Sequence, residues 1–120
     1  MRLLAVHPVL MSSDVRASIA FYERLGFKLG FQDDPAKPRY AGIIRDSVEL
    51  HLQWHDEAKS GDRPVYRFLV DDVDALFTEL GDAVGQQQSP WRKPGDTPWG
   101  TREFHVRDPD GNGLQFYRSR

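Results

Sequence analysis

The feature that most constrains the fold of this chain is an internal duplication. Matching residues recur between its halves: Leu10 aligns with Phe68, Asp14-Val15 with Asp72-Val73, Ala17 with Ala75 and, after a slip of three residues, Leu25-Gly26 with Leu80-Gly81. A repeated unit too small to bury its apolar face alone packs against its copy. The 120 residues are therefore expected to form one domain, 1–120, with a first module at 1–55, a linker at 56–63 and a second module at 64–120.

Within the first module, the pattern predicts a strand, a helix and three further strands. The apolar run Leu3–Leu10 is too short for a helix and predicts a strand. Capping oxygens at Ser12–Asp14 precede apolar residues at helical spacing, and Gly26 provides a helix end. Runs rich in apolar and aromatic residues then predict strands at Phe27–Phe31, Tyr40–Arg45 and Ser47–Trp54.

The second module repeats this order after the hydrophilic connector His55–Arg63. Its expected elements are a strand at Tyr66–Val70, a helix at Val73–Leu80 capped by Asp71 and Asp72, a strand end and surface loop at Gln86–Gly100, and a hairpin of Thr101–Arg107 and Leu114–Arg118 around Asp108-Pro109-Asp110-Gly111. The predicted class is α+β. Two tandem βαβββ modules would form a curved mixed sheet around a cleft, with the helices outside, in a homodimer.

Composition excludes several classes of function. The formal net charge is −2, from 16 Lys and Arg against 18 Asp and Glu, which provides no basic footprint for nucleic acid or anionic lipid. There is no cysteine, so disulfides, thiolate metal sites and cysteine nucleophiles are excluded. The N-terminal apolar run is short for a signal peptide, and none approaches the ~20 residues of a membrane helix. We expect a cytoplasmic protein that binds a small molecule and its own second copy, but neither nucleic acid nor membrane.

Period-two alternation separates core positions from positions that face a cleft. In the fourth strand, Leu50 and Leu52 share one face, while Glu49 and His51 share the other. Curvature of the sheet would gather polar side chains on one concave side: His7, Glu49, His51, His105, Gln115 and Tyr117.

The whole chain resembles the vicinal oxygen chelate superfamily, which contains glyoxalase I, fosfomycin-modifying enzymes, extradiol dioxygenases and bleomycin resistance proteins. The resemblance rests on the duplicated plan, on Phe21-Tyr22 with Leu25-Gly26-Phe27, and on Asp108-Pro109-Asp110-Gly111. Trp99-Gly100-Thr101, shortly before that turn, makes the chain most similar to the bleomycin resistance proteins. An incomplete set of metal ligands adds to this similarity.

Metal-dependent members of that superfamily place ligands in the first and last strand of each module. The resemblance puts these positions at His7, Glu49, Val65 and Gln115. Val65 has no donor atom and Gln115 is a weak neutral donor, whereas zinc prefers at least three charged or imidazole ligands. We therefore expect no metal cofactor. The alternative is a site for Zn, Ni, Mn or Fe on His7 and Glu49, joined by Gln115 or rescued by His51 or His105.

The same resemblance implies a non-catalytic protein that sequesters a planar, cationic antibiotic such as bleomycin in a groove at a dimer interface. By resemblance, Trp99 and Trp91 stack on the flat rings of the ligand, while Glu49 and Glu103 meet its positive charge. Such contacts contribute about 1 kcal/mol each. The remaining polar positions of the cleft complete the expected ligand site: His7, His51, His105, Gln115 and Tyr117.

Purely structural roles are the alternatives to these assignments. Each tryptophan could instead anchor the long loop against the sheet, and His7 could simply hydrogen-bond a neighbour. The alternative from another class of function is a metal-dependent glyoxalase-like lyase or isomerase, or a dioxygenase. The sequence has no G-x-S-x-G elbow, P-loop or dinucleotide fingerprint, so acyl transfer is not expected and no residue is assigned as catalytic.

Overall fold

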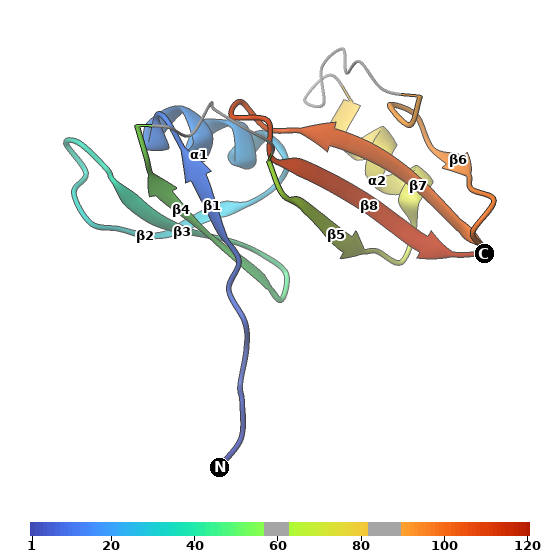
Figure 1. Cartoon of the computed structure of the whole chain (residues 1–120), viewed down its shortest axis with the longest axis horizontal. Helices are drawn as coiled ribbons and strands as arrows, with labels where there is room; N and C mark the ends of the chain where they lie inside the picture. Colours follow the sequence, from blue (N-terminus) through green and yellow to red (C-terminus); the bar gives the residue numbers. More distant parts are fainter. Residues whose placement is uncertain (57–62, 82–89) are drawn as a thin grey trace. The chain divides into compact units, whose positions relative to one another are not determined.

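The computed structural model describes residues 1–56, 63–81 and 90–120 (Figure 1). The chain divides into two compact units, Met1–Ser60 and Gly61–Arg120, and each has its own helix and its own four-stranded sheet. The predicted class and the repeated βαβββ order are confirmed. Most of the expected linker, 56–63, lies outside the described residues.

The first unit packs one helix on one face of a mixed sheet. Its elements are β1 (Val9–Ser12), α1 (Val15–Arg24), β2 (Lys28–Gln32), β3 (Tyr40–Arg45) and β4 (Val48–Trp54). The strand order is β1-β4-β3-β2, with β1 parallel to β4 and the other pairs antiparallel. Leu50 and Leu52 are buried, as are Ile19 and Tyr22 of the helix. The opposite face of β4 is left for Glu49 and His51.

The second unit repeats this arrangement. Its elements are β5 (Val65–Leu69), α2 (Val73–Leu80), β6 (Gly95–Asp96), β7 (Thr101–Arg107) and β8 (Gly113–Ser119). The strand order is β5-β8-β7-β6, again with the first strand parallel to the last. Phe104, Val106 and Leu114 form the buried side of this sheet.

The duplication extends to the helix caps. Asp14 accepts a hydrogen bond of 3.1 Å from the backbone N–H of Ala17, and Asp72 accepts one of 3.0 Å from Ala75. Each aspartate thereby satisfies a backbone donor that has no partner inside its helix. The aligned pairs Asp14/Asp72 and Ala17/Ala75 therefore have the same structural role at the two helix starts.

The prediction of a strand at Leu3–Leu10 is wrong at its start, because β1 begins only at Val9. Residues Met1–Pro8, the N-terminal arm, have no regular secondary structure, and Met1 to His7 are exposed. Pro8 has no N–H to offer a sheet, although its carbonyl accepts a hydrogen bond from His51 N. Met1, Leu3, Leu4 and Val6 of the arm are each at least 86% exposed, so their composition alone does not make them a strand.

The segment Gln86–Gly100 also differs from its prediction. Part of it, up to residue 89, lies outside the described residues, and Gly95–Asp96 forms the short strand β6 against Glu103 and Arg102 of β7. The hairpin after it is confirmed. No helix in the described part of the chain has the length and apolarity that crossing a membrane requires.

Candidate functional site

In the first unit, polar and aromatic side chains gather on the sheet face opposite α1. This first-unit cluster consists of His7, Phe31, Tyr40, Glu49 and His51. His51 is its centre, because Nε2 lies 2.6 Å from Glu49 Oε2 and Nδ1 lies 2.6 Å from the Tyr40 hydroxyl. His7 Nδ1 approaches the same Glu49 oxygen at 3.5 Å. One carboxylate oxygen therefore serves two imidazoles.

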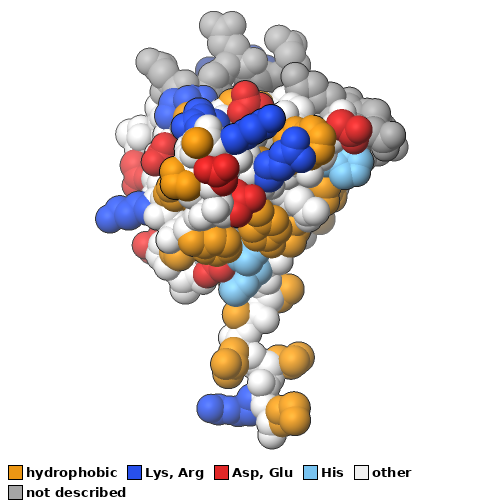
Figure 2. All heavy atoms as spheres, turned by 90° about the vertical axis from the view of Figure 1, so that its left-hand side faces the viewer, with side chains coloured by type: hydrophobic (Ala, Val, Ile, Leu, Met, Phe, Trp, Pro, Cys, Tyr) orange, Lys and Arg blue, Asp and Glu red, His pale blue; other side chains and the backbone are white. Residues whose placement is uncertain are grey.

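Phe31 joins this cluster because Gly42 leaves room for it. A Cβ at Gly42 would overlap the Phe31 ring, so the residue opposite His51 in the sheet has to be small. The ring then lies edge-on to His51, with centroids 5.3 Å apart, and stacks on Tyr40 at 6.2 Å. Figure 2 shows apolar side chains beside histidine side chains, close to where the N-terminal arm leaves the body of the unit. The cluster thus combines an accessible aromatic ring, 45% exposed at Phe31, with polar groups.

A second cluster lies on the sheet of the second unit. This second-unit cluster contains Arg67, Trp91, Trp99, Thr101, Glu103, His105, Gln115 and Tyr117. The guanidinium of Arg67 donates to Gln115 Oε1 at 2.6 Å and lies 4.2 Å from the centroid of the Tyr117 ring. The register explains this, because Arg67 of β5 pairs directly with Gln115 of β8.

Glu103 is the buried charge of this cluster. Its side chain has no exposed surface and accepts hydrogen bonds from Arg67 at 3.0 Å, Thr101 at 2.5 Å and His105 at 2.7 Å. Burial alone would raise the pKa of this carboxyl, but these three donors outweigh it and hold the pKa at about 2. Glu103 also raises the pKa of Arg67 through their hydrogen bond. The carboxylate is therefore ionised at neutral pH and already neutralised by a partner.

Trp91 and Trp99 belong to this cluster through their ring contacts. Trp91 lies edge-on to Trp99, with ring centroids 5.9 Å apart, and its ring centroid is 6.0 Å from that of His105. The backbone carbonyl of Trp91 also accepts a hydrogen bond from His105 N at 2.7 Å. Trp91 thus anchors its segment on β7, whereas Trp99 keeps 59% of its surface exposed. Of the two rings, Trp99 offers the larger free face to a ligand.

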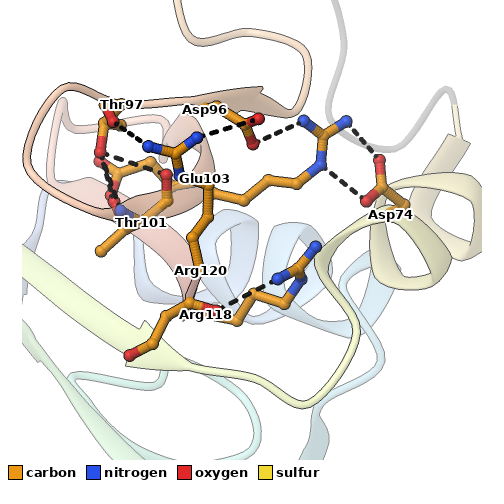
Figure 3. A network of polar contacts seen from close by, with 9 residues as sticks. Asp74, Asp96, Thr97, Thr101, Glu103, Arg118 and Arg120 are labelled. Carbon is orange, nitrogen blue, oxygen red and sulfur yellow. Dashed lines mark hydrogen bonds and ion pairs between the residues drawn. The ribbon is translucent and has the colours of Figure 1, made fainter.

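An arginine network supports the edge strand next to this cluster. Arg102 donates to Asp74 of α2 at 2.8 and 2.9 Å and to Asp96 of β6 at 3.0 Å (Figure 3). These bonds raise the pKa of Arg102 and lower the pKa values of both aspartates. Arg120 approaches Asp96 from the chain end, with 3.4 Å between Nη1 and Oδ2. The network ties β6 and α2 to β7 and so fixes the strand that carries Glu103.

The structure brings the predicted residues together in two sets. One set is His7, Glu49 and His51 of the first unit; the other is Trp91, Trp99, Glu103, His105, Gln115 and Tyr117 of the second. Sequence reasoning did not assign Phe31, Tyr40, Thr101 or Arg67 to the site. Arg67 of β5 and Tyr40 of β3 join these sets through the strand register, which the sequence pattern does not specify. The roles in ligand binding stay predictions.

The chemistry of the two clusters differs. The first has two imidazoles around one carboxylate, a donor set suited to a cation or a hydrogen-bonding ligand. The second presents aromatic faces beside an arginine whose charge is balanced by Glu103. Aromatic faces favour flat rings and cations.

Comparison with known proteins agrees with this fold. The sequence profile of the Glyoxalase/Bleomycin resistance protein/Dioxygenase superfamily matches residues 5–116. A bleomycin resistance protein of Geobacillus stearothermophilus is 29% identical over 130 residues, which span 92% of this chain and 93% of the relative. The crystal structure of the bleomycin-binding protein from bleomycin-producing Streptomyces verticillus, complexed with copper(II)-bleomycin, is 31% identical with a TM-score of 0.80, covering 100% of this chain and 99% of that one. A bleomycin resistance determinant encoded on the transposon Tn5, 24% identical, has the same fold with a TM-score of 0.79, covering 98% of this chain and 99% of its own.

Proposed function

Because the chain belongs to the glyoxalase/bleomycin resistance protein/dioxygenase superfamily, we propose that it binds a bleomycin-type antibiotic and holds it without transforming it. The observation that carries this proposal is the full-length likeness, at 31% identity, to a bleomycin-binding protein. The clusters are compatible with such a ligand, since bleomycin is planar in part and cationic. Protection would come from stoichiometric sequestration.

The second-unit cluster offers aromatic faces to such a ligand. Trp99 exposes more than half of its surface and lies against Trp91, so a flat ring that stacks on Trp99 would also meet a second aromatic edge. Stacking of this kind contributes about 0.5–1.5 kcal/mol per pair beyond the buried area. Trp99 is therefore the principal aromatic anchor that we propose.

The first-unit cluster offers a carboxylate to a cationic ligand. Glu49 is partly exposed, with 28% of its side chain open, and its direct partners are histidines rather than an arginine or lysine. Glu103 differs, because it is fully buried and is paired with Arg67. Of the two carboxylates expected to meet positive charge, Glu49 is the one that we propose for contact with a cationic ligand.

We also propose that the protein acts as a homodimer in the cytoplasm. Support for the dimer comes from the N-terminal arm, in which Met1, Leu3, Leu4 and Val6 are between 86% and 126% exposed. Apolar side chains in such a row gain about 25 cal/mol per Å² when they leave water. A second copy would provide the covering surface, as the homodimer expected from the sequence requires. The cytoplasmic location remains a prediction from the sequence.

The test is calorimetric titration of metal-free bleomycin into tag-free protein that has been treated with a chelator. We expect saturable binding at one site per chain, and mass spectrometry should recover the bleomycin unchanged after prolonged incubation. Absence of binding would overturn the proposed ligand. A modified product would overturn the non-catalytic mechanism and point instead to an enzyme of the same superfamily.

A further inference from the structure

We propose that the first unit has a further binding site, which takes a small molecule through its phosphate group. A cavity of about 240 Å³ lies where the start of α1 meets the end of β4 and the loop between β2 and β3. Ligand cavities in proteins usually span about 300–1,000 Å³, so this one suits a small molecule rather than a chain segment. The charged and aromatic residues that line it are Asp14, Arg16, Lys37, Arg39 and Trp54.

This cavity lies on the helix side of the first sheet. Trp54 shares its face of β4 with the buried residues Leu50 and Leu52, because side chains alternate along a strand. Glu49 and His51 belong to the opposite face, which carries the first-unit cluster. The described residues that line the cavity include none of that cluster. The site is therefore separate from the side chains proposed for the antibiotic.

The charge of the cavity favours a dianion. Arg16, Lys37 and Arg39 line it against the single carboxylate of Asp14, which leaves a formal net charge of +2. Asp14 already caps α1 by accepting a hydrogen bond from the N–H of Ala17 at 3.1 Å, so the positive charge comes from side chains and not from the helix start. A phosphate monoester carries about −1.5 to −2 at neutral pH and matches this charge. A carboxylate would balance only half of it.

The loop between β2 and β3 uses its own carboxylates to hold its backbone. Oδ1 of Asp33 accepts hydrogen bonds from the backbone N–H groups of Arg39 and Tyr40, at 2.9 and 3.2 Å. Oδ1 of Asp34 accepts one from the N–H two residues later, at 2.9 Å. Neither aspartate lines the cavity. Within the described residues, Lys37 and Arg39 form no ion pair with a carboxylate, so both cations are available to a ligand.

The two arginines are held in position before any ligand arrives. The guanidinium of Arg39 lies over the ring of Trp54, 4.1 Å from its centroid, and a guanidinium on a ring face keeps its in-plane N–H donors for a phosphate. Nη2 of Arg16 donates to the carbonyls of Pro35 and Ala36 at 2.9 and 2.7 Å, which ties the loop to α1. Donors fixed in this way lose little conformational freedom on binding.

The test is a titration of ¹⁵N-labelled, full-length protein with phenyl phosphate at constant ionic strength, followed by NMR. The ring of this probe can pack on the apolar lining of Val15 and Pro38. We expect saturable shifts of the backbone amides within 13–16 and 36–39 and of the indole N–H of Trp54. Benzoate has the same ring but one negative charge, and should bind about fivefold more weakly.

Substitutions of the cations complete the test. Lys37→Gln and Arg39→Gln should each lower the affinity for phenyl phosphate about fivefold, because each removes a charge-assisted contact. The matched control is Lys28→Gln, an exposed lysine of β2 outside the cavity, which should bind like the unaltered protein. Lys37 is itself exposed, so its replacement keeps the test decisive if Arg39→Gln fails to fold.

Three outcomes would each overturn the site: no saturable shift at the cavity, equal affinity for benzoate and phenyl phosphate, or unchanged affinity in Lys37→Gln. This proposal does not rest on the proposed antibiotic binding. Bleomycin should bind Lys37→Gln as tightly as the unaltered protein, and failure of bleomycin to bind at all leaves the phosphate site standing.

Discussion

Arg67 donates a hydrogen bond of 3.0 Å from Nη2 to the fully buried carboxylate of Glu103, while its guanidinium lies over the ring of Tyr117. This contact pairs the negative charge of Glu103 with a cation of the second unit. It also leaves 38% of the arginine side chain exposed. The second-unit cluster is therefore aromatic and close to neutral on its open side.

Removal of Arg67 should destabilise the protein. In Arg67→Ala the carboxylate of Glu103 stays buried but loses its compensating cation, a change that costs about 3–5 kcal/mol for a fully buried pair. Because Arg67 is partly exposed, we expect about 2 kcal/mol in the free energy of unfolding measured with urea. Lys93→Ala, which removes an exposed cation of the same unit, should change it by less than about 0.5 kcal/mol. Equal effects of the two substitutions would show that the pair contributes nothing specific.

Because the pKa of Glu103 is lowered, the free energy of unfolding should fall as the solution is made acidic. The folded-state pKa is about 2 against an ordinary value of 4.5, so the unfolded chain binds the proton first as the pH falls. The stabilisation is fully present above about pH 4.5 and is lost between there and about pH 2, amounting to at most about 3 kcal/mol. Unfolding curves at stepwise pH should show Glu103→Gln less stable than the unaltered protein at pH 7, with a gap that narrows below pH 4.5. A gap independent of pH would contradict the ionised assignment.

Substitution of Trp99 should weaken ligand binding while the fold persists. Trp99→Ala removes the exposed aromatic face, and we expect a loss of about 1–3 kcal/mol in the binding free energy of bleomycin, measured by calorimetry. The control is Trp54→Phe, because Trp54 lies in the first unit, where its ring faces the guanidinium of Arg39 at 4.1 Å. If Trp99→Ala binds as tightly as the unaltered protein, Trp99 has no place in the site.

The stability of the turn between β7 and β8 should depend on the carboxylate of Asp108. Buried Asp108 accepts hydrogen bonds from the backbone N–H groups of Asp110 and Asn112, both at 2.9 Å, and from the Asn112 side chain at 2.8 Å. Asp108→Ala leaves these donors without their acceptor, which we expect to cost about 2–4 kcal/mol. The loss should appear as a lower midpoint in thermal unfolding, whereas exposed Asp56→Ala should leave the midpoint nearly unchanged. A similar shift in both variants would remove the special role of Asp108.

Period-two alternation was sufficient to predict that Glu49 and His51 share a face, since a strand permits no other arrangement. The duplication likewise predicted that Asp14 and Asp72 have equivalent positions, and both cap a helix. Contacts between strands are different, because sequence pattern does not specify register. Arg67 and Tyr40 were missed for that reason. Their partners, Gln115 and His51, become neighbours only when β5 pairs with β8 and β3 with β4.

The N-terminal arm shows a second limit of sequence pattern. Its apolar run resembles a strand, yet a strand exists only where a neighbouring chain supplies backbone partners. Pro8 provides a carbonyl to His51, and regular pairing with β4 begins at Val9. Composition predicts what a segment could pair with, but not whether its own chain provides the partner.

In the first sheet, the strand that is synthesised first, β1, pairs with β4, and in the second sheet β5, likewise synthesised first, pairs with β8. During synthesis, the nascent chain thus has every strand of its first sheet once Trp54 has left the ribosome, before Val65 exists to compete for β4. Each sheet waits only for its own final strand, so the first sheet can form before the strands of the second module are synthesised. An ancestral gene could therefore be doubled without any change to the order in which its product folds.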